Sequence, residues 1–537
     1  MITKLIDKKF FVKHAPFLLP FLSAALLILS FYPFKIYILS FVALIPLFHF
    51  IYFTPSTNKT RAFWGGLIVG SMFSTSISFF TLMQFNWLPE TYLFIWITRL
   101  LFIPIAIVTG FIAGLSTVFL KKIQSKSVNI NIFAFASVWV LVEYVVSVVF
   151  AGFHYGLLAY TSASIPFLIQ LSSIGGTYFV SFLIVMTNGF VSSIFYFSTK
   201  SHADNAFESK LRKVFLSAIV VSVLLITVFY ANKYYLYKEV PEATEVSFAI
   251  IQIQDRRKGA FGDFVDGEFS FPKLENIIKT ANKFNPDIIT YPFSSFVGVI
   301  SSSTNPSIVF DRKVITGNFE SMGKWVSKNV NKNSVFLTWN NVLRDRSFYN
   351  EFNFWKDGEL ISYYQKRDLF PFMDYTPKFA QKINLFSTPF DVEWGSYEQR
   401  STLGDMRVSN LICSEVNKSS ITRKDGAWAN IFISIGSEAM FRDSVAGDLN
   451  LINAQFRAAE NNRPIVRDDR LGPSAIIDRD GSIIDKMDFG EEGVLFKKIE
   501  IEKDPKRTFY SFTGDLLFIF ILILFLVGIT YKKRKAY

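Results

Sequence analysis

Long apolar segments separated by short basic loops make up the first 230 residues of the chain. A helix needs roughly 20 apolar residues to cross the hydrocarbon core of a bilayer. Eight segments approach that length: residues 16–33, 36–53, 62–85, 92–119, 131–150, 166–198 and 213–231 precede a polar region, and residues 512–531 follow it. The chain is therefore predicted to be a polytopic membrane protein.

One of these segments, residues 166–198, is too long for a single straight span. It contains Gly175 and Gly176, and glycine interrupts helices readily. We expect the segment to start as an interfacial or re-entrant piece around these two glycines.

The basic residues between the spans are unevenly distributed. Lysine and arginine cluster before the first span and after the second, fourth, sixth and last spans, whereas the loops 86–91 and 151–162 contain neither. Cytoplasmic loops carry the excess of positive charge in membrane proteins. Both termini are therefore predicted to be cytoplasmic, and residues 240–510 to lie outside the cytoplasm. A cleaved signal peptide does not fit the N-terminus, because further spans follow at once.

Composition divides the chain into a bundle of about seven spans (1–235), a soluble-type domain (245–505) and a last span with a basic cytoplasmic tail (510–537). Apolar runs of strand length in the middle part are Val246–Ile253, Asp287–Tyr291, Ser334–Trp339, Val408–Cys413, Ile431–Ile435, Pro464–Arg467 and Ser474–Asp478. Helical stretches such as Phe271–Phe284 and Val445–Asn461 lie between several of them. Strands that alternate with helices indicate a layered α/β domain.

The central domain lacks the residues on which many hydrolases and metalloenzymes depend. All four histidines of the chain lie outside residues 240–510, so the domain has no histidine base and no histidine metal ligand. A single cysteine excludes an intramolecular disulfide and a CxxC site. The net charge of +12 does not indicate nucleic-acid binding, because many basic residues lie in loops between spans. No metal or organic cofactor is indicated, and carboxylates, lysines and one thiol remain for any chemistry.

Cys413 ends an apolar strand and is followed by Ser414 and Glu415. Sites in α/β sheets collect at the carboxyl ends of strands. A lone cysteine is often only a small buried hydrophobic residue, and a reactive thiol needs a nearby cation or base. Lys366 is the candidate cation, and the alternative for it is a solvated surface lysine.

Several segments, taken in order, resemble the apolipoprotein N-acyltransferases, the membrane branch of the nitrilase (carbon–nitrogen hydrolase) superfamily. The matching segments are residues 152–155 (GFHY), 170–188, 366–372 (KRDLFPF), 410–415 (NLICSE), 441–444 (FRDS) and 457–467 (RAAENNRPIVR). They are similar to the family's GFPW, QxxxxxGxyxxSFLxxxxN, KRHLVPFGEY, ICYE, WFGDS and RAxExxRPxxR stretches, in that order. Each motif alone is weak, whereas their order along the chain is specific.

The resemblance implies a fold, a location and a reaction. The fold is a membrane α-helical bundle of about eight spans with an extracytoplasmic nitrilase-like α/β sandwich domain, in the bacterial cytoplasmic (inner) membrane. The reaction transfers a fatty acyl group from a phospholipid, through a thioester on Cys413, to the N-terminal amine of a diacylglyceryl-cysteine lipoprotein. In the family the cysteine is the nucleophile, the lysine, here Lys366, stabilises the oxyanion, and a glutamate is the general base.

The sequence departs from the family at that glutamate. The family's WPE segment is Tyr291-Pro292-Phe293 here, so the base position carries a phenylalanine, which cannot accept a proton. Asp374, at the family's second acidic position, and Glu415 are the candidate replacements. Three further positions concern substrate access: Ser414 stands where the family has tyrosine, Phe261 in the lipid-access loop, and Phe441 in the WFGDS-like loop.

Two hypotheses remain open. In the first, Asp374 or Glu415 takes over the proton and the chain is a divergent acyltransferase, which the retention of Cys413 and Lys366 favours. In the second, the chain is a catalytically silent paralogue that binds phospholipid or lipoprotein, which Phe293 favours. Hydrolysis of a small soluble amide is a third reading, and it is disfavoured because such a substrate gives no reason for eight spans.

Overall fold

The structure, a computed structural model, divides into two compact units, Met1–Lys238 with Phe512–Tyr537 and Glu239–Ser511. It describes residues 17–82, 100, 102–150, 155–201, 205–238, 242–253, 263–265, 268–270, 272–292, 299–301, 315–345, 347–371, 374–382, 392–396, 399–437 and 444–535. Each unit is described by itself below.

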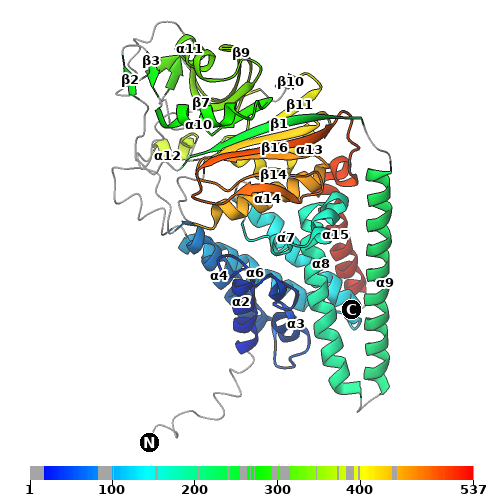
Figure 1. Cartoon of the computed structure of the whole chain (residues 1–537). Helices are drawn as coiled ribbons and strands as arrows, with labels where there is room; N and C mark the ends of the chain where they lie inside the picture. Colours follow the sequence, from blue (N-terminus) through cyan, green and yellow to red (C-terminus); the bar gives the residue numbers. More distant parts are fainter. Residues whose placement is uncertain are drawn as a thin grey trace, which may run out of the picture. The chain divides into compact units, whose positions relative to one another are not determined.

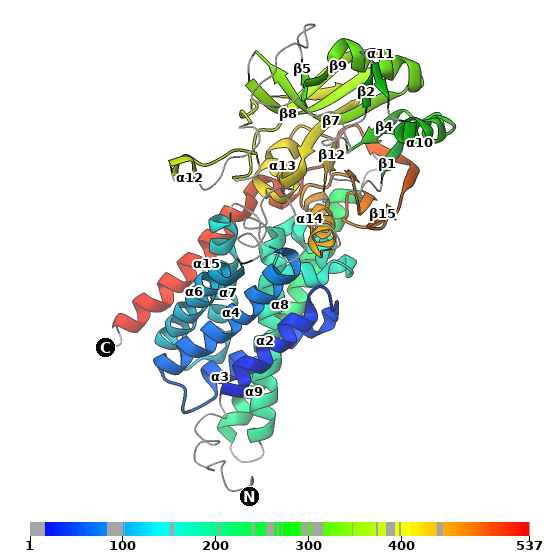
Figure 2. The same cartoon turned by 90° about the vertical axis from the view of Figure 1, so that its left-hand side faces the viewer.

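Apolar helices make up the first unit (Figures 1 and 2). Six are long and apolar enough to cross a membrane: α4 (Lys59–Leu82), α6 (Phe102–Ile123), α7 (Val128–Val149), α8 (Pro166–Ser201), α9 (Asn205–Tyr237) and α15 (Phe509–Lys535). Shorter apolar helices are α2 (Leu18–Ser30) and the pair η3 (Tyr37–Phe41) and α3 (Ile45–Tyr52). The predicted membrane bundle is thus confirmed, with six or more apolar helices.

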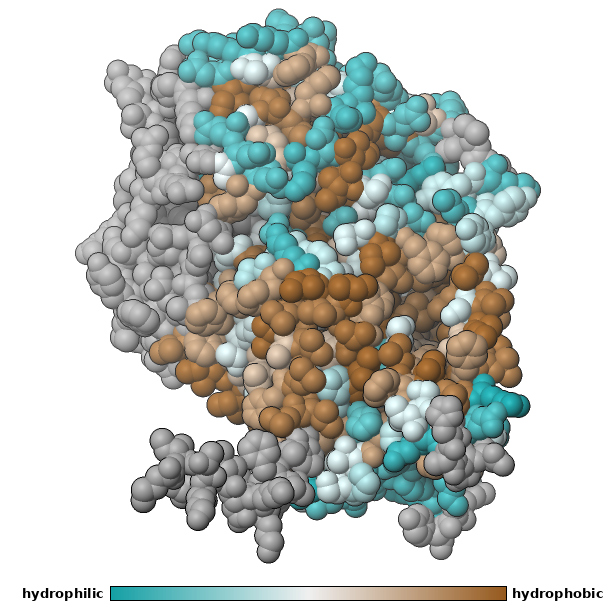
Figure 3. Space-filling view, turned by 60° about the horizontal axis from the view of Figure 1, so that its bottom comes forward, coloured by the Kyte–Doolittle hydropathy of each residue, from teal (hydrophilic) through white to brown (hydrophobic). Residues whose placement is uncertain are grey.

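The surface of the helices is apolar where lipid would contact it. Large hydrophobic side chains are exposed on α6 and α9, among them Ile107, Leu216 and Leu224. Figure 3 shows a broad apolar surface (brown) bordered by hydrophilic residues (teal). Exposed apolar surface of this extent is typical of a membrane or an interface, and a helix that is hydrophobic all round indicates a membrane span.

The long helix α8 contains the predicted break. Gly176 has a φ of 78° and a ψ of −180°, so two helical pieces meet there. Further along α8, the Asn188 side chain accepts a hydrogen bond from the Leu44 backbone N–H at 2.8 Å and donates one to the Ser40 carbonyl at 2.9 Å. Backbone groups inside a membrane must find hydrogen-bond partners within the protein. The Asn188 side chain is such a partner for two backbone groups in the segment where η3 and α3 replace one continuous helix.

Two sheets packed face to face form the second unit. The first has the strand order β16-β1-β4-β7-β5-β6, with β8 on β7 and β9 on β8, and the second has the order β10-β11-β12-β13-β14-β15. The first sheet contains β1 (Ala243–Gln252), β4 (Ile288–Tyr291), β5 (Val299–Ser301), β6 (Ile315–Asn318), β7 (Val335–Arg344), β8 (Ser347–Lys356), β9 (Glu359–Gln365) and β16 (Gly493–Glu502). The second contains β10 (Ser401–Leu403), β11 (Met406–Ile412), β12 (Ile431–Gly436), β13 (Ile465–Asp469), β14 (Ser474–Ile477) and β15 (Ile483–Met487).

Helices cover the outer face of each sheet. Side chains alternate along a strand, so Phe248 and Ile250 of β1 pack between the sheets, whereas Ala249 and Ile251 pack against α10 (Pro272–Asn282) and α11 (Phe319–Asn329). In the second sheet, Leu411 packs with residues of α13 (Ser419–Gly426) and α14 (Ala446–Asn461). The unit is therefore a four-layered helix–sheet–sheet–helix sandwich, and the predicted layered α/β class is confirmed.

The apolar layer between the sheets is expected to dominate the stability of this unit. Phe354 on β8 is fully buried in it, whereas Ile361 on the neighbouring β9 is 45% exposed. Replacing Phe354 by alanine is expected to cost about 3–5 kcal/mol, because a large cavity remains. Thermal unfolding in detergent, followed by tryptophan fluorescence, measures the change. The matched control Ile361→Ala should shift the midpoint far less, and equal shifts would contradict the packing described here.

Candidate active site

Cys413 lies at the turn that follows β11, as the first residue of the short helix η5 (Cys413–Asn417). Its φ is 52°, a left-handed conformation that residues with a β-carbon rarely adopt. The side chain is partly exposed and packs against the apolar layer between the sheets. Strained backbone of this kind clusters at functional sites. Cys413 thus lies at the carboxyl end of β11, where sites in α/β sheets collect.

Lys366 follows the last residue of β9 and is only 2% exposed. Its Nζ donates to Asp374 Oδ2 at 2.6 Å. Burial by itself lowers the pKa of Lys366, but the nearby charges of Asp374, Cys413 and Glu415 outweigh burial and raise the pKa above its ordinary value. Lys366 is therefore a buried, permanently charged cation next to the thiol and not a solvated surface lysine.

Asp374 is held by three donors. Besides Lys366, the Asn350 side chain donates to Asp374 Oδ1 at 2.7 Å, and the Phe370 backbone N–H donates to Oδ2 at 2.7 Å. A carboxylate that is paired with a cation and hydrogen-bonded at both oxygens is a poor proton acceptor, because protonation breaks these contacts. The arrangement favours a role for Asp374 in fixing Lys366 over the predicted role as a base.

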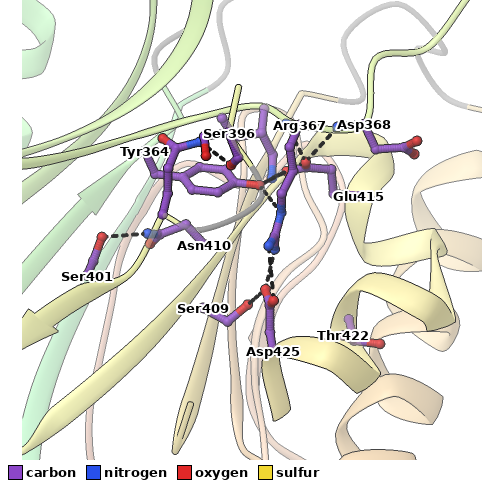
Figure 4. A network of polar contacts seen from close by, with 12 residues as sticks. Tyr364, Arg367, Asp368, Ser396, Ser401, Ser409, Asn410, Glu415, Thr422 and Asp425 are labelled. Atoms are coloured by element: carbon purple, nitrogen blue, oxygen red, sulfur yellow. Dashed lines mark hydrogen bonds and ion pairs between the residues drawn. The ribbon is translucent and has the colours of Figure 1, made fainter. Parts of the chain in front are cut away.

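Glu415 is fully buried and accepts hydrogen bonds from one side chain and three backbone groups (Figure 4). The donors are the Tyr364 hydroxyl (2.9 and 3.0 Å) and the backbone N–H groups of Ile412 (2.8 Å), Arg367 (3.0 Å) and Asp368 (3.2 Å). Burial raises the pKa of Glu415 to about 7, although the Ile412 N–H and the charges of Lys366 and Arg367 oppose the shift. Through these hydrogen bonds Glu415 holds the turn at Cys413 against the segment that follows Lys366.

The network continues through Arg367 to the helix behind the second sheet. Arg367 Nε donates to the Tyr364 hydroxyl at 3.0 Å, and its terminal nitrogens form an ion pair with Asp425 on α13. The Ser409 hydroxyl on β11 donates to the same carboxylate at 2.6 Å. Figure 4 shows these side chains converging between the two segments. Hydrogen bonds and an ion pair thereby connect the strands next to Lys366 and Cys413, β9 and β11.

The structure brings together four of the residues predicted for the site: Cys413, Lys366, Glu415 and Asp374. Ser414 is 6% exposed, and its hydroxyl has no hydrogen-bond partner among the described residues. Three other predicted positions, Phe261, Phe293 and Phe441, lie outside the described residues. Sequence reasoning missed Asn350 and Tyr364, because a polar residue within a strand gives no sign of which distant carboxylate it contacts.

The site can perform nucleophilic acyl chemistry. A buried cation favours the thiolate form of a nearby cysteine, and a fixed positive donor stabilises the oxyanion of a tetrahedral intermediate. Within the part of the chain that the structure describes, no group of three His, Cys, Asp or Glu side chains has the arrangement of a metal site.

Comparisons with known proteins agree with this geometry. The carbon–nitrogen hydrolase family model matches residues 316–503, which assigns the sandwich to that class. The model of the apolipoprotein N-acyltransferase N-terminal domain matches residues 23–190. The chain is therefore similar to the apolipoprotein N-acyltransferases in its N-terminal helices and to the carbon–nitrogen hydrolases in its sandwich domain.

Several curated relatives carry that name. Apolipoprotein N-acyltransferase 1 of Treponema denticola is 25% identical over 437 residues, which cover 73% of this chain and 75% of that protein. The apolipoprotein N-acyltransferase of Borreliella burgdorferi is 23% identical over 523 residues, covering 91% and 90%. Among solved structures, Nit3 of Saccharomyces cerevisiae, from branch 10 of the nitrilase superfamily, is 16% identical with a TM-score of 0.35, covering 49% of this chain and 92% of Nit3.

Proposed function

We propose that this protein transfers a fatty acyl group from a phospholipid to the N-terminal amine of a diacylglyceryl-cysteine lipoprotein. The observation that carries the proposal is the placement of Cys413, in a left-handed turn, within the electrostatic influence of the buried Lys366–Asp374 pair. A buried ion pair is weak evidence for stability, so its position beside a thiol favours a catalytic role.

Two covalent steps make up the proposed reaction. The Cys413 sulfur attacks the ester carbonyl of the phospholipid while its proton passes to a base, and the Lys366 ammonium stabilises the oxyanion. The ester C–O bond then breaks, the lysophospholipid alcohol takes the proton, and a thioester remains. The lipoprotein amine attacks the thioester, forms the amide, and returns the thiol to Cys413.

The membrane helices favour a substrate that stays in the bilayer. We further propose that the protein resides in the bacterial inner membrane with both termini in the cytoplasm and the sandwich on the opposite side. The distribution of lysine and arginine supports that orientation. Cysteine accessibility to a membrane-impermeant reagent at either end of the chain, after placing single cysteines there, would test it.

Incubation of the purified protein with a defined diacyl phospholipid, followed by peptide mass spectrometry, tests the reaction. The expected result is an acyl mass on the Cys413 peptide that hydroxylamine removes and that Cys413→Ala lacks. A family member with an intact WPE segment provides the positive control. If that control is acylated and this protein is not, the acyl-transfer proposal fails, and a silent paralogue that binds phospholipid or lipoprotein, favoured by Phe293, takes its place.

A further inference from the structure

Asp468 is a buried carboxyl group that the site described above does not use. It lies on β13, is fully buried, and neither carboxyl oxygen has a hydrogen-bond partner among the described residues. Buried polar groups almost always have such partners. An acid left without them destabilises a fold, so its presence calls for a functional explanation.

The register of the second sheet places Asp468 in the same cross-strand row as the residue before the nucleophile. Ile412 of β11 pairs with Ile435 of β12, and Ile435 pairs with Asp468. Ile412 and Ile435 belong to the apolar layer between the sheets, so Asp468 points into that layer too. Neighbouring strands are about 4.8 Å apart, which puts the Cα atoms of Ile412 and Asp468 about 10 Å apart.

Across the sandwich, the Thr290 hydroxyl on β4 lies beside the Asp468 carboxyl. It lowers the Asp468 pKa, although its position does not meet hydrogen-bond geometry, and it has no other partner among the described residues. β4 ends at Tyr291, and Phe293, the position of the family's glutamate, follows two residues later. The acid of β13 therefore faces the strand from which the family's base would extend.

We infer that Asp468, with the Thr290 hydroxyl beside it, accepts the proton of the Cys413 thiol in place of the missing glutamate. This inference rests on the acyl transfer proposed above. The distance between the strands is too long for a direct hydrogen bond, so the proton passes through the Thr290 hydroxyl or one water. Because the same proton then protonates the alcohol that leaves the ester, Asp468 returns to its charged form when the thioester is complete.

The electrostatic surroundings suit this role. Burial raises the pKa of Asp468 well above its ordinary value, Asp469 adds to the rise, and the Thr290 hydroxyl and Arg467 oppose it. Asp469 itself is paired with Arg467 at 3.0 Å. A base works best when its pKa approaches that of its proton donor. A carboxylate with an ordinary pKa of about 3.9 is a far weaker base than a thiolate, whose conjugate thiol has a pKa of about 8.5. A raised pKa therefore makes Asp468 a better acceptor for the thiol proton.

The test compares Asp468→Asn with wild type in two assays. The first is the pH profile of Cys413 alkylation by iodoacetamide, which needs no acyl donor. Two groups that share a proton titrate in coupled steps, so Asp468→Asn should remove one inflection from the wild-type profile. The second is acylation by a diacyl phospholipid, whose rate should fall by a factor on the order of 10²–10⁴. Asp485→Asn, at a partly exposed acid on β15, is the matched control and should change neither.

The unfolding temperature of Asp468→Asn distinguishes a role of Asp468 as a base from a purely structural role. A raised pKa in the folded protein means that the stability contributed by Asp468 is lost as pH rises through that pKa. Asp468→Asn should therefore unfold at an equal or higher temperature than wild type in alkaline buffer while its acylation falls. Adding Phe293→Glu to this variant should restore acylation by returning a carboxylate to the family's position.

The outcomes distinguish the two proposals. If wild type and Asp468→Asn are acylated at equal rates and have the same alkylation profile, the inference about Asp468 is overturned and the acyltransferase function stands. If wild type forms no thioester but the alkylation profiles differ, the acyl-transfer proposal fails while the coupling of Asp468 to Cys413 holds.

Discussion

Replacing Lys366 by methionine is expected to lower the rate of thioester formation on Cys413 by a factor of at least about 10²–10³, the usual effect of removing one oxyanion donor. Methionine fills a similar volume but carries no charge. The variant also leaves Asp374 buried without its cation, and breaking a buried pair from one side costs about 3–5 kcal/mol. Lys366→Met should therefore lower both the rate of acylation and the temperature of thermal unfolding.

A double variant separates these two effects. Replacing both partners of a buried ion pair by apolar residues is often neutral for stability, so Lys366→Met with Asp374→Leu should recover much of the lost unfolding temperature. Its acylation should stay at the level of Lys366→Met. Lys498→Met, at an exposed lysine paired with Glu245, is the matched control and should behave as wild type. Wild-type acylation by Lys366→Met would refute the assigned role of the lysine.

Replacing Glu415 by alanine is expected to cause the largest loss of stability among the site residues. The carboxylate accepts from the Tyr364 hydroxyl and from the backbone N–H groups of Ile412, Arg367 and Asp368. A buried donor left without a partner costs about 1–3 kcal/mol, so several such donors together cost several kcal/mol. Glu415→Gln should also destabilise, because its amide N–H₂ would face backbone N–H donors.

Limited proteolysis and thermal unfolding in detergent measure this loss. Glu393→Gln, at an exposed glutamate near the same elements, is the control and should unfold as wild type does. The prediction also decides between two roles for Glu415. If Glu415→Gln is as stable as wild type but cannot form the thioester, then Glu415 is a base and the anchoring role described here is wrong.

The strands that follow an apolar pattern were predictable, and the polar ones were not. VSFAIIQI predicted β1 and IFISI predicted β12 to within a few residues. β8 has the sequence SFYNEFNFWK and was missed. Its asparagines and Glu351 bind other polar side chains on the sheet, as in the pair Arg344–Glu351, and single-strand periodicity contains no information about such partners.

The same limitation applies to the site. Cys413 and Lys366 were predictable from a resemblance in local sequence, whereas their mutual position depends on two sheets that meet only in the folded domain. The run Pro464–Arg467 predicted β13 but stopped before Asp468, because consecutive aspartates are rare in strands. The structure extends β13 to Asp469. The buried acid thus lay just past the predicted boundary, where composition favours a loop.

The pairing of β1 with β16 has a consequence for the synthesis of the protein. These strands begin and end the domain, yet they pair along their whole length, from Ala243 with Glu502 to Gln252 with Gly493. While the chain is being made, β1 therefore waits with one edge unpaired until nearly all of the domain has been translated, and such non-local pairing folds slowly. An exposed strand edge invites aggregation and proteolysis. Premature termination anywhere before β16 should thus yield a product that the cell degrades, so the domain matures only in chains that extend through β16.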